Sequence, residues 1–141
     1  LTAILAATAF WRVNAAETWL TDLPKAEAQA KTENKIVLMD FTGSDWCPWC
    51  IKLDKETYSQ PAFADYAKTN LVLVKVDFPH HTEQSADLKK ANEALAKKYD
   101  IDGFPTEIAV KPDGTVVWKN VGYLPGGPAA MIAELDKAKQ K

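Results

Sequence analysis

The chain contains two cysteines, and they stand three residues apart in the segment Trp46-Cys47-Pro48-Trp49-Cys50. On one turn of a helix, side chains at this spacing lie on the same side, so the two sulfurs can close a disulfide. Such a pair exchanges electrons with other disulfides through a mixed-disulfide intermediate, in which one thiolate attacks and the second thiol resolves the complex. The spacing therefore predicts thiol–disulfide exchange, with Cys47 as the attacking cysteine and Cys50 as the resolving one.

The neighbouring segments must place Cys47 at the first turn of a helix. Residues 35–41 form a short, partly β-branched apolar run, which is typical of a buried strand. Residues 51–58 are good helix formers, and Pro48 suits a first turn because its missing N–H removes no helical bond. Unpaired N–H groups and the positive end of the helix dipole stabilise a thiolate there. We expect a lowered pKa and an exposed sulfur at Cys47, and a more sheltered sulfur at Cys50.

Two other interpretations of the cysteine pair stay open. The pair could be a passive disulfide, although the chain-entropy relation gives only about 2 kcal/mol for so short a loop. It could also be half of a zinc site in a metal-binding or metal-delivery module. Such a site needs two more ligands, and the only histidines, His80 and His81, are adjacent, so on an extended chain their side chains point opposite ways. We therefore expect no metal site and keep metal binding as the alternative function.

Length and charge narrow the class of protein. With 141 residues the chain is expected to form one domain that buries a core without help from disulfides. The formal net charge of −2, with basic residues spread along the chain, gives no electrostatic case for nucleic-acid binding. No apolar run approaches the length that spans a bilayer.

The first residues have the pattern of a secretory signal peptide. Residues 1–11 are apolar or small and carry no charge, and Val13-Asn14-Ala15 would serve as a small-residue cleavage site. We therefore expect residues 1–15 to be the remnant of a signal peptide and residues 16–141 to be the domain. A native first helix packed on the domain is the alternative. The signal-peptide interpretation implies a periplasmic or secreted protein, in a compartment where disulfides persist.

Hydrophobic periodicity and turn residues predict alternating strands and helices in the rest of the chain. Strands are expected at 35–41 and 71–78, followed by a hairpin of 106–111 and 115–121 around a Pro112-Asp113-Gly114 turn. Further helices are expected at 23–32, 62–68, 85–99 and 129–139. In the helix 85–99, the residues expected to face the core are Leu88, Ala91, Leu95 and Ala96. This order predicts an α/β fold, a three-layer α/β/α sandwich around a central mixed sheet.

Several of these segments together resemble the thioredoxin superfamily. They are Asp40-Phe41, the Trp46–Cys50 segment, Lys75, Gly103-Phe104-Pro105-Thr106 and Val121-Gly122-Tyr123-Leu124, in this order along the chain. The resemblance extends over nearly all of residues 17–141. Within the superfamily, the chain is similar to secreted bacterial thioredoxin-like proteins of the disulfide isomerase and thiol–disulfide interchange type.

The resemblance implies roles for residues outside the cysteine segment. Pro105 is expected to be a cis-proline facing the cysteine pair, and Phe104 to line a groove in which a substrate peptide pairs as an added strand. Trp46, Pro48 and Trp49 are expected to bind the substrate together with Phe104 and Pro105.

Asp40 resembles the buried carboxylate that handles the proton of the resolving thiol, and Lys75 resembles its partner on the adjacent strand. Asp40 is also an acid inside an apolar run, which by itself suggests a raised pKa and an acid–base role near neutral pH. An acid that merely ends the strand in water is the other interpretation.

Three features depart from the family pattern. Six residues separate Asp40 from Cys47, one more than in thioredoxin itself, so we expect a bulge at Gly43 that alters how Asp40 reaches Cys50. The dipeptide Pro48-Trp49 leaves the reduction potential open, and the bulky residue before Pro105 is expected to narrow the range of accepted peptides.

The sequence thus predicts an oxidoreductase that reduces or isomerises protein disulfides. No cofactor is expected, because the cysteine pair is itself the electron carrier. A partner must regenerate the pair, and a membrane electron donor or an oxidase is expected, depending on the direction of the reaction. A redox-inert peptide-binding domain on the same fold is a further possibility.

Overall fold

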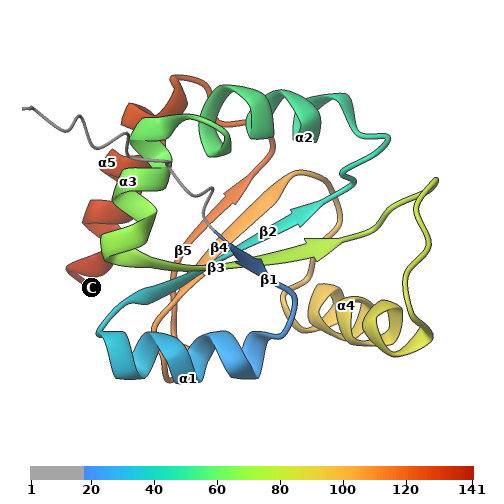
Figure 1. Cartoon of the computed structure of the whole chain (residues 1–141), viewed down its shortest axis with the longest axis horizontal. Helices are drawn as coiled ribbons and strands as arrows, with labels where there is room; N and C mark the ends of the chain where they lie inside the picture. The colour runs from blue at the N-terminus through green and yellow to red at the C-terminus, as the bar shows by residue number, and fades with distance from the viewer. Residues whose placement is uncertain (1–17) are drawn as a thin grey trace, which may run out of the picture.

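A five-stranded mixed sheet runs through the part of the chain that the structure describes, residues 18–141 of a computed structural model (Figure 1). The strand order is β1-β3-β2-β4-β5, in which β1, β3 and β2 run parallel, β4 pairs antiparallel with β2, and β5 pairs antiparallel with β4. The strands are β1 (Trp19–Leu20), β2 (Ile36–Thr42), β3 (Leu71–Asp77), β4 (Thr106–Val110) and β5 (Val116–Val121). The predicted signal-peptide remnant and its cleavage site lie outside the described residues.

Helices cover both faces of this sheet. They are α1 (Leu23–Glu33), α2 (Pro48–Leu53), α3 (Pro61–Asn70), α4 (Ala86–Lys98) and α5 (Gly127–Lys139), and a π-helical turn η1 (Asp54–Tyr58) continues α2. Figure 1 shows α2, α3 and α5 on one side of the sheet and α1 and α4 on the other. The predicted three-layer α/β/α sandwich with a mixed sheet is confirmed. No helix among residues 18–141 is both long enough and apolar enough to cross a membrane.

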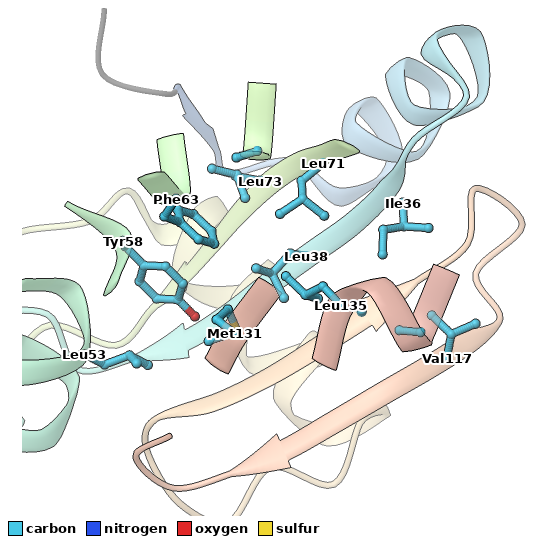
Figure 2. Close-up of a cluster of buried hydrophobic side chains, with 13 residues drawn as sticks. Ile36, Leu38, Leu53, Tyr58, Phe63, Leu71, Leu73, Val117, Met131 and Leu135 are labelled. Atoms are coloured by element: carbon cyan, nitrogen blue, oxygen red, sulfur yellow. The ribbon is translucent and has the colours of Figure 1, made fainter. Parts of the chain in front are cut away.

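Each face of the central strands has its own apolar core, because successive side chains of a strand point to opposite faces. On β2, Leu38 joins the core beneath α3 and α5, and Figure 2 shows it close to Phe63, Met131 and Leu135. Alternate β2 residues such as Met39 belong to the core beneath α1. By the same alternation, Asp40 lies on the face of Leu38, beneath the layer that contains α2.

The predicted buried stripe of α4 is confirmed only in part, at Leu95, which packs against the core beneath α1. Ala91 is exposed and Leu88 and Leu95 are only half-buried, whereas Asn92 is the buried residue of the helix and donates its side-chain amide to the Asp77 carbonyl at 3.0 Å. The apolar residues of α4 instead line a groove shared with α1. Periodicity located the apolar side of the helix, but it could not show that part of this side faces a groove shared with α1, while Asn92 faces the end of β3.

Candidate active site at the Cys47–Cys50 pair

Cys47 and Cys50 lie at the start of α2, as predicted. Cys47 is the N-cap of the helix, Pro48 occupies its first turn, and the two cysteines form a disulfide with a Cα–Cα distance of 5.2 Å. The backbone N–H of Cys50 donates to the sulfur of Cys47 at 3.2 Å. A hydrogen bond of this kind stabilises a thiolate on Cys47 after the disulfide is reduced. The helix-terminus position thus supports Cys47 as the attacking cysteine.

The predicted contrast in exposure between the two cysteines is wrong for the oxidised pair. Cys47 is 5% exposed and Cys50 is 4% exposed, so both are buried. The sulfur of Cys47 lies 3.8 Å from the carbonyl oxygen of Phe104, which belongs to the loop before β4. Exposure does not distinguish the cysteines in this form, but the N-cap position of Cys47 and the hydrogen bond that its sulfur accepts from the Cys50 amide do.

The loop before β4 brings a cis-proline to the cysteine pair. The Phe104–Pro105 peptide bond is cis, which confirms the prediction for Pro105. The half-buried Phe104 ring lies edge-on to Trp46, with ring centroids 6.0 Å apart, and close to Phe78, with centroids 5.1 Å apart. Phe104 and Trp46 therefore form an aromatic wall beside the disulfide.

The loop after β3 is tied to the segment that precedes Cys47. The Asp45 carboxylate accepts hydrogen bonds from the backbone N–H groups of His80 at 2.9 Å and His81 at 2.8 Å. These bonds, with that of His80 first, lower the pKa of Asp45. The Trp46 indole donates to the Phe78 carbonyl at 2.7 Å, and the His80 ring stacks on it with centroids 4.2 Å apart. His80 is exposed, and through this stacking it belongs to the site, which sequence reasoning did not predict.

The extra residue between Asp40 and Cys47 is accommodated in a turn, so the predicted bulge at Gly43 is wrong. Strand β2 pairs with β3 without a shift in register through Thr42. The Gly43 carbonyl then accepts hydrogen bonds from the N–H groups of Trp46 at 3.3 Å and Cys47 at 2.9 Å. The Trp46 indole lies directly over Gly43, where an added Cβ would stand 2.6 Å from the indole nitrogen.

We predict that Gly43→Ala destabilises the protein by about 1–3 kcal/mol, because the new methyl group displaces the Trp46 ring from a packed position. Urea unfolding, followed by tryptophan fluorescence, measures the change. Gly103→Ala is the matched control, since a Cβ at Gly103 meets no atom within 4 Å. Equal stability of the two variants would contradict the packing of Trp46 on Gly43.

Asp40 is 4% exposed, and its Oδ1 has no hydrogen-bond partner in the described part of the chain. Burial raises the pKa of Asp40 to about 7, although nearby Lys75 opposes the shift. Lys75 stands opposite Asp40 in the β2–β3 register, and its ammonium group lies 5.2 Å from the centre of the Trp19 ring. The structure thus brings Asp40 and Lys75 together, and a carboxyl that titrates near neutral pH suits the predicted acid–base role.

Sequence reasoning missed a second buried carboxyl, that of Glu107 on β4. Glu107 is fully buried and stands opposite Asp40 in the β2–β4 register. Burial raises the pKa of Glu107 to about 8, while a 2.8 Å hydrogen bond donated by the Asn120 amide opposes the shift. The available signal was the one that identified Asp40, namely an acid inside a short apolar strand.

A second aromatic contact involves Trp49, the residue between Pro48 and Cys50 in the sequence. Trp49 is 55% exposed, and its ring centroid lies 5.4 Å from that of Tyr123. The Lys52 ammonium group lies 5.3 Å from the Trp49 ring centre and 4.9 Å from the Tyr123 ring centre, and the Tyr123 hydroxyl donates to Glu56. Pro48, between Cys47 and Trp49 in the sequence, is exposed as well.

The cysteine sulfurs are bonded to each other, so in this form they are not the thiolate ligands that a zinc site requires. Residues 18–141 contain no group of three or more histidine, cysteine, aspartate or glutamate side chains arranged to hold a metal ion.

Comparisons with known proteins identify the thioredoxin-like family. The profile of the thioredoxin-like domain matches residues 23–139. The disulfide bond reductase DsbH of Chlamydia pneumoniae is 32% identical over 114 residues, which cover 81% of this chain and 68% of DsbH. Thioredoxin H4 of Arabidopsis thaliana is 31% identical over 109 residues, which cover 75% of this chain and 72% of that protein.

Solved structures agree with the sequence matches. The structure of a DsbH oxidoreductase superposes with a TM-score of 0.83 at 28% identity, covering 98% of this chain and 95% of the other. The oxidised C-terminal domain of Neisseria meningitidis DsbD superposes with a TM-score of 0.62 at 20% identity, covering 86% of this chain and 99% of the other. The second likeness supports the fold alone.

Proposed function

Because the chain belongs to the thioredoxin-like family and its Cys47–Cys50 pair carries thiol–disulfide redox chemistry, we propose that it works as a reductase of protein disulfides. The observation that carries the proposal is the Cys47–Cys50 disulfide at the start of α2, next to Pro105 and above buried carboxyl groups. The 32% identity to a disulfide bond reductase supports the reducing direction.

Electrostatics supports the same direction. Asp40 and Glu107 are buried on the sheet face that α2 covers, and Asp54 follows α2 directly. Negative charge near a thiol pair destabilises its thiolates, and a pair whose reduced form is poorly stabilised is a stronger reductant. The carboxyl groups beneath the pair therefore favour electron donation by the reduced protein.

The proposed reaction transfers two electrons to the substrate disulfide. The Cys47 thiolate attacks one substrate sulfur, the substrate S–S bond breaks, and the first substrate sulfur leaves as a thiolate that takes a proton from water. Cys50 then gives its proton to Asp40 and attacks the sulfur of Cys47. The bond between Cys47 and the substrate breaks, the second substrate thiolate leaves, and the Cys47–Cys50 disulfide forms.

Substrate peptides are proposed to bind along the cis-proline loop. The backbone beside Pro105 can pair with an extended peptide as an added strand, as in other β-augmentation complexes. Phe104 and Trp46 would contact the peptide on one side of the disulfide, and Pro48 and Trp49 on the other. Lys75 is proposed to act through Asp40, because it stands opposite that carboxyl in the sheet.

The activity is proposed to take place outside the cytoplasm, in the periplasm or after secretion. Support comes from the apolar N-terminal pattern of residues 1–15. Electrons would then come from a membrane electron-donor partner, and the cysteine pair needs no further cofactor for the exchange.

Equilibration with glutathione buffers tests the direction of the reaction. We expect a reduction potential near about −270 mV, the range of thioredoxin, measured from the fraction of reduced protein after alkylation of its thiols. A potential near about −120 mV, typical of strong oxidants, would rule out a reductase. An isomerase would be indicated if the Cys50→Ser variant still reactivated scrambled ribonuclease.

A further inference from the structure

Four polar residues form a single row across the sheet beneath the cysteine pair. Lys75 on β3 stands opposite Asp40 on β2, Asp40 opposite Glu107 on β4, and Glu107 opposite Asn120 on β5. Figure 1 shows these four strands side by side. Two residues earlier on β2, Leu38 pairs with Leu73 and Ala109, so the next row on the same face is apolar.

The two carboxyl groups at the centre of the row have few partners. Asp40 and Glu107 are both buried, and within residues 18–141 the Oδ1 atom of Asp40 and the Oε1 atom of Glu107 have no hydrogen-bond partner. Residues directly opposite on antiparallel strands have Cβ atoms about 4.5–5.5 Å apart, and like charges at this distance repel. Two carboxylates so placed in a buried site do not ionise independently.

The surrounding charges do not neutralise a doubly ionised pair. Among residues 18–141, Lys75 on β3 is the one cation that acts on Asp40, and Asp77 and Asp54 add negative charge. From η1, Tyr58 contributes a buried hydroxyl that has no hydrogen-bond partner among the described residues, and Figure 2 shows this hydroxyl pointing into the apolar cluster. Burial, followed by the charges of Asp40 and Glu107, raises the pKa of Tyr58.

Asn120 holds Glu107 at the outer end of the row. Its side-chain amide donates to the Glu107 Oε2 atom and to the Gly122 carbonyl, both at 2.8 Å. Asn120 is half-buried on β5, the last strand of the sheet, and the next residue, Val121, is 61% exposed. Glu107 is therefore fixed between the buried Asp40 carboxyl and the solvent-facing edge of the sheet.

We propose that Glu107 is a positioning residue of the exchange reaction that shares one proton with Asp40 and so sets when Asp40 can take the proton of Cys50. This proposal rests on the reductase function proposed above. With one proton on the pair, Asp40 is available as a base. Once Asp40 accepts the Cys50 proton, the pair holds two protons, and one returns to solvent when the cycle closes. The raised pKa values of both carboxyls, caused chiefly by burial, agree with this proton count.

The test uses 5,5′-dithiobis(2-nitrobenzoic acid) as a chromogenic disulfide and the whole reduced protein. Attack by Cys47 releases the first thionitrobenzoate, and resolution by Cys50 releases the second, so stopped-flow absorbance separates the two steps. In the wild-type protein we expect the resolution rate to rise with pH over two ionisations. In Glu107→Gln we expect one ionisation, with its midpoint lower by about one pH unit, a tenfold change in the ionisation constant.

Matched variants separate this effect from a structural one. Glu93→Gln neutralises an exposed carboxyl of α4 and should keep the wild-type profile. Asn120→Ala removes the hydrogen bond that lowers the pKa of Glu107, so both ionisations should remain and the upper one should move most, to higher pH. If both row variants keep the wild-type profile while both release steps occur, the proposal is overturned and the reductase function stands. Absence of the first release in wild-type protein would instead refute the reductase function.

Urea unfolding between pH 4 and pH 9 gives a readout that does not depend on turnover. A carboxyl with a raised pKa in the folded state stabilises the protein fully below its unfolded pKa, and this contribution is lost as pH rises through the folded pKa. The wild-type free energy of unfolding should therefore fall from about pH 4 to about pH 8, with a smaller fall in Glu107→Gln. Equal slopes would overturn the proposal.

Discussion

We expect the Cys47→Ser variant to reduce insulin disulfides no faster than the uncatalysed background reaction. A serine hydroxyl cannot form the mixed disulfide from which every later step proceeds. Serine is also a preferred N-cap residue, so the variant should keep the start of α2 and the fold. The turbidity of precipitating insulin in the presence of dithiothreitol measures the rate, and circular dichroism checks the fold. A folded Cys47→Ser protein that retained catalysis would refute the assignment of the attacking cysteine.

The Cys50→Ser variant is the comparison for Cys47→Ser, because Cys47 should still attack the disulfide in it. This variant should release the first thionitrobenzoate at close to the wild-type rate but should not release the second, since no thiol remains to resolve the complex. The pair of variants therefore distinguishes the roles of two cysteines that are equally buried in the structure. Equal loss of the first release in both variants would contradict those roles.

The second large effect is expected from Asp40→Asn, which should slow resolution by about 100-fold while leaving attack by Cys47 intact. The buried Asp40 carboxyl has a pKa raised to about 7, so it is a suitable acceptor for the Cys50 proton near neutral pH, and an amide is not. Stopped-flow release of the second thionitrobenzoate measures the rate. Asp87→Asn, which neutralises an exposed carboxyl of α4, is the matched control. Resolution by Asp40→Asn at the wild-type rate would remove Asp40 from the mechanism.

The same substitution should stabilise the protein at pH 8. The folded pKa of Asp40 lies above its unfolded value of 3.8, so its stabilising contribution is complete at acidic pH and is lost as pH rises through about 7. A shift of about three pKa units corresponds to about 4 kcal/mol of stability lost above pH 7. Asp40→Asn should recover part of this loss, and urea unfolding at pH 5 and pH 8 measures it.

Local patterns were sufficient for the elements that carry the cysteines. The apolar run that became β2 and the proline after Cys47 are short-range features, and they placed Cys47 at the N-cap of α2. The cis peptide at Pro105 was expected from the family resemblance, together with the position of the proline just before a strand. Strand β1 was not predicted, because two residues, Trp19 and Leu20, are too few to show a periodic pattern.

The missed features of the site depend on contacts between distant segments. Glu107 became part of the site only through the pairing of β4 with β2, a register that no local pattern encodes. His80, 34 residues after Trp46 in the chain, stacks on the Trp46 ring because the Asp45 carboxylate binds the His80 backbone. Cys47 is likewise buried against a distant segment, the loop that contains Phe104. Side-chain types predicted the chemistry, and tertiary packing determined which groups tune it.

The most direct test of the central claim is to identify the covalent complex that Cys50→Ser forms with a protein disulfide. The variant is incubated with insulin, free thiols are alkylated, and non-reduced peptides are mapped by mass spectrometry. We predict a substrate cysteine joined by a disulfide to the peptide that contains Cys47, and no such complex with Cys47→Ser. Absence of that adduct, with insulin disulfides intact, would contradict the assignment of Cys47 as the residue that attacks other proteins' disulfides.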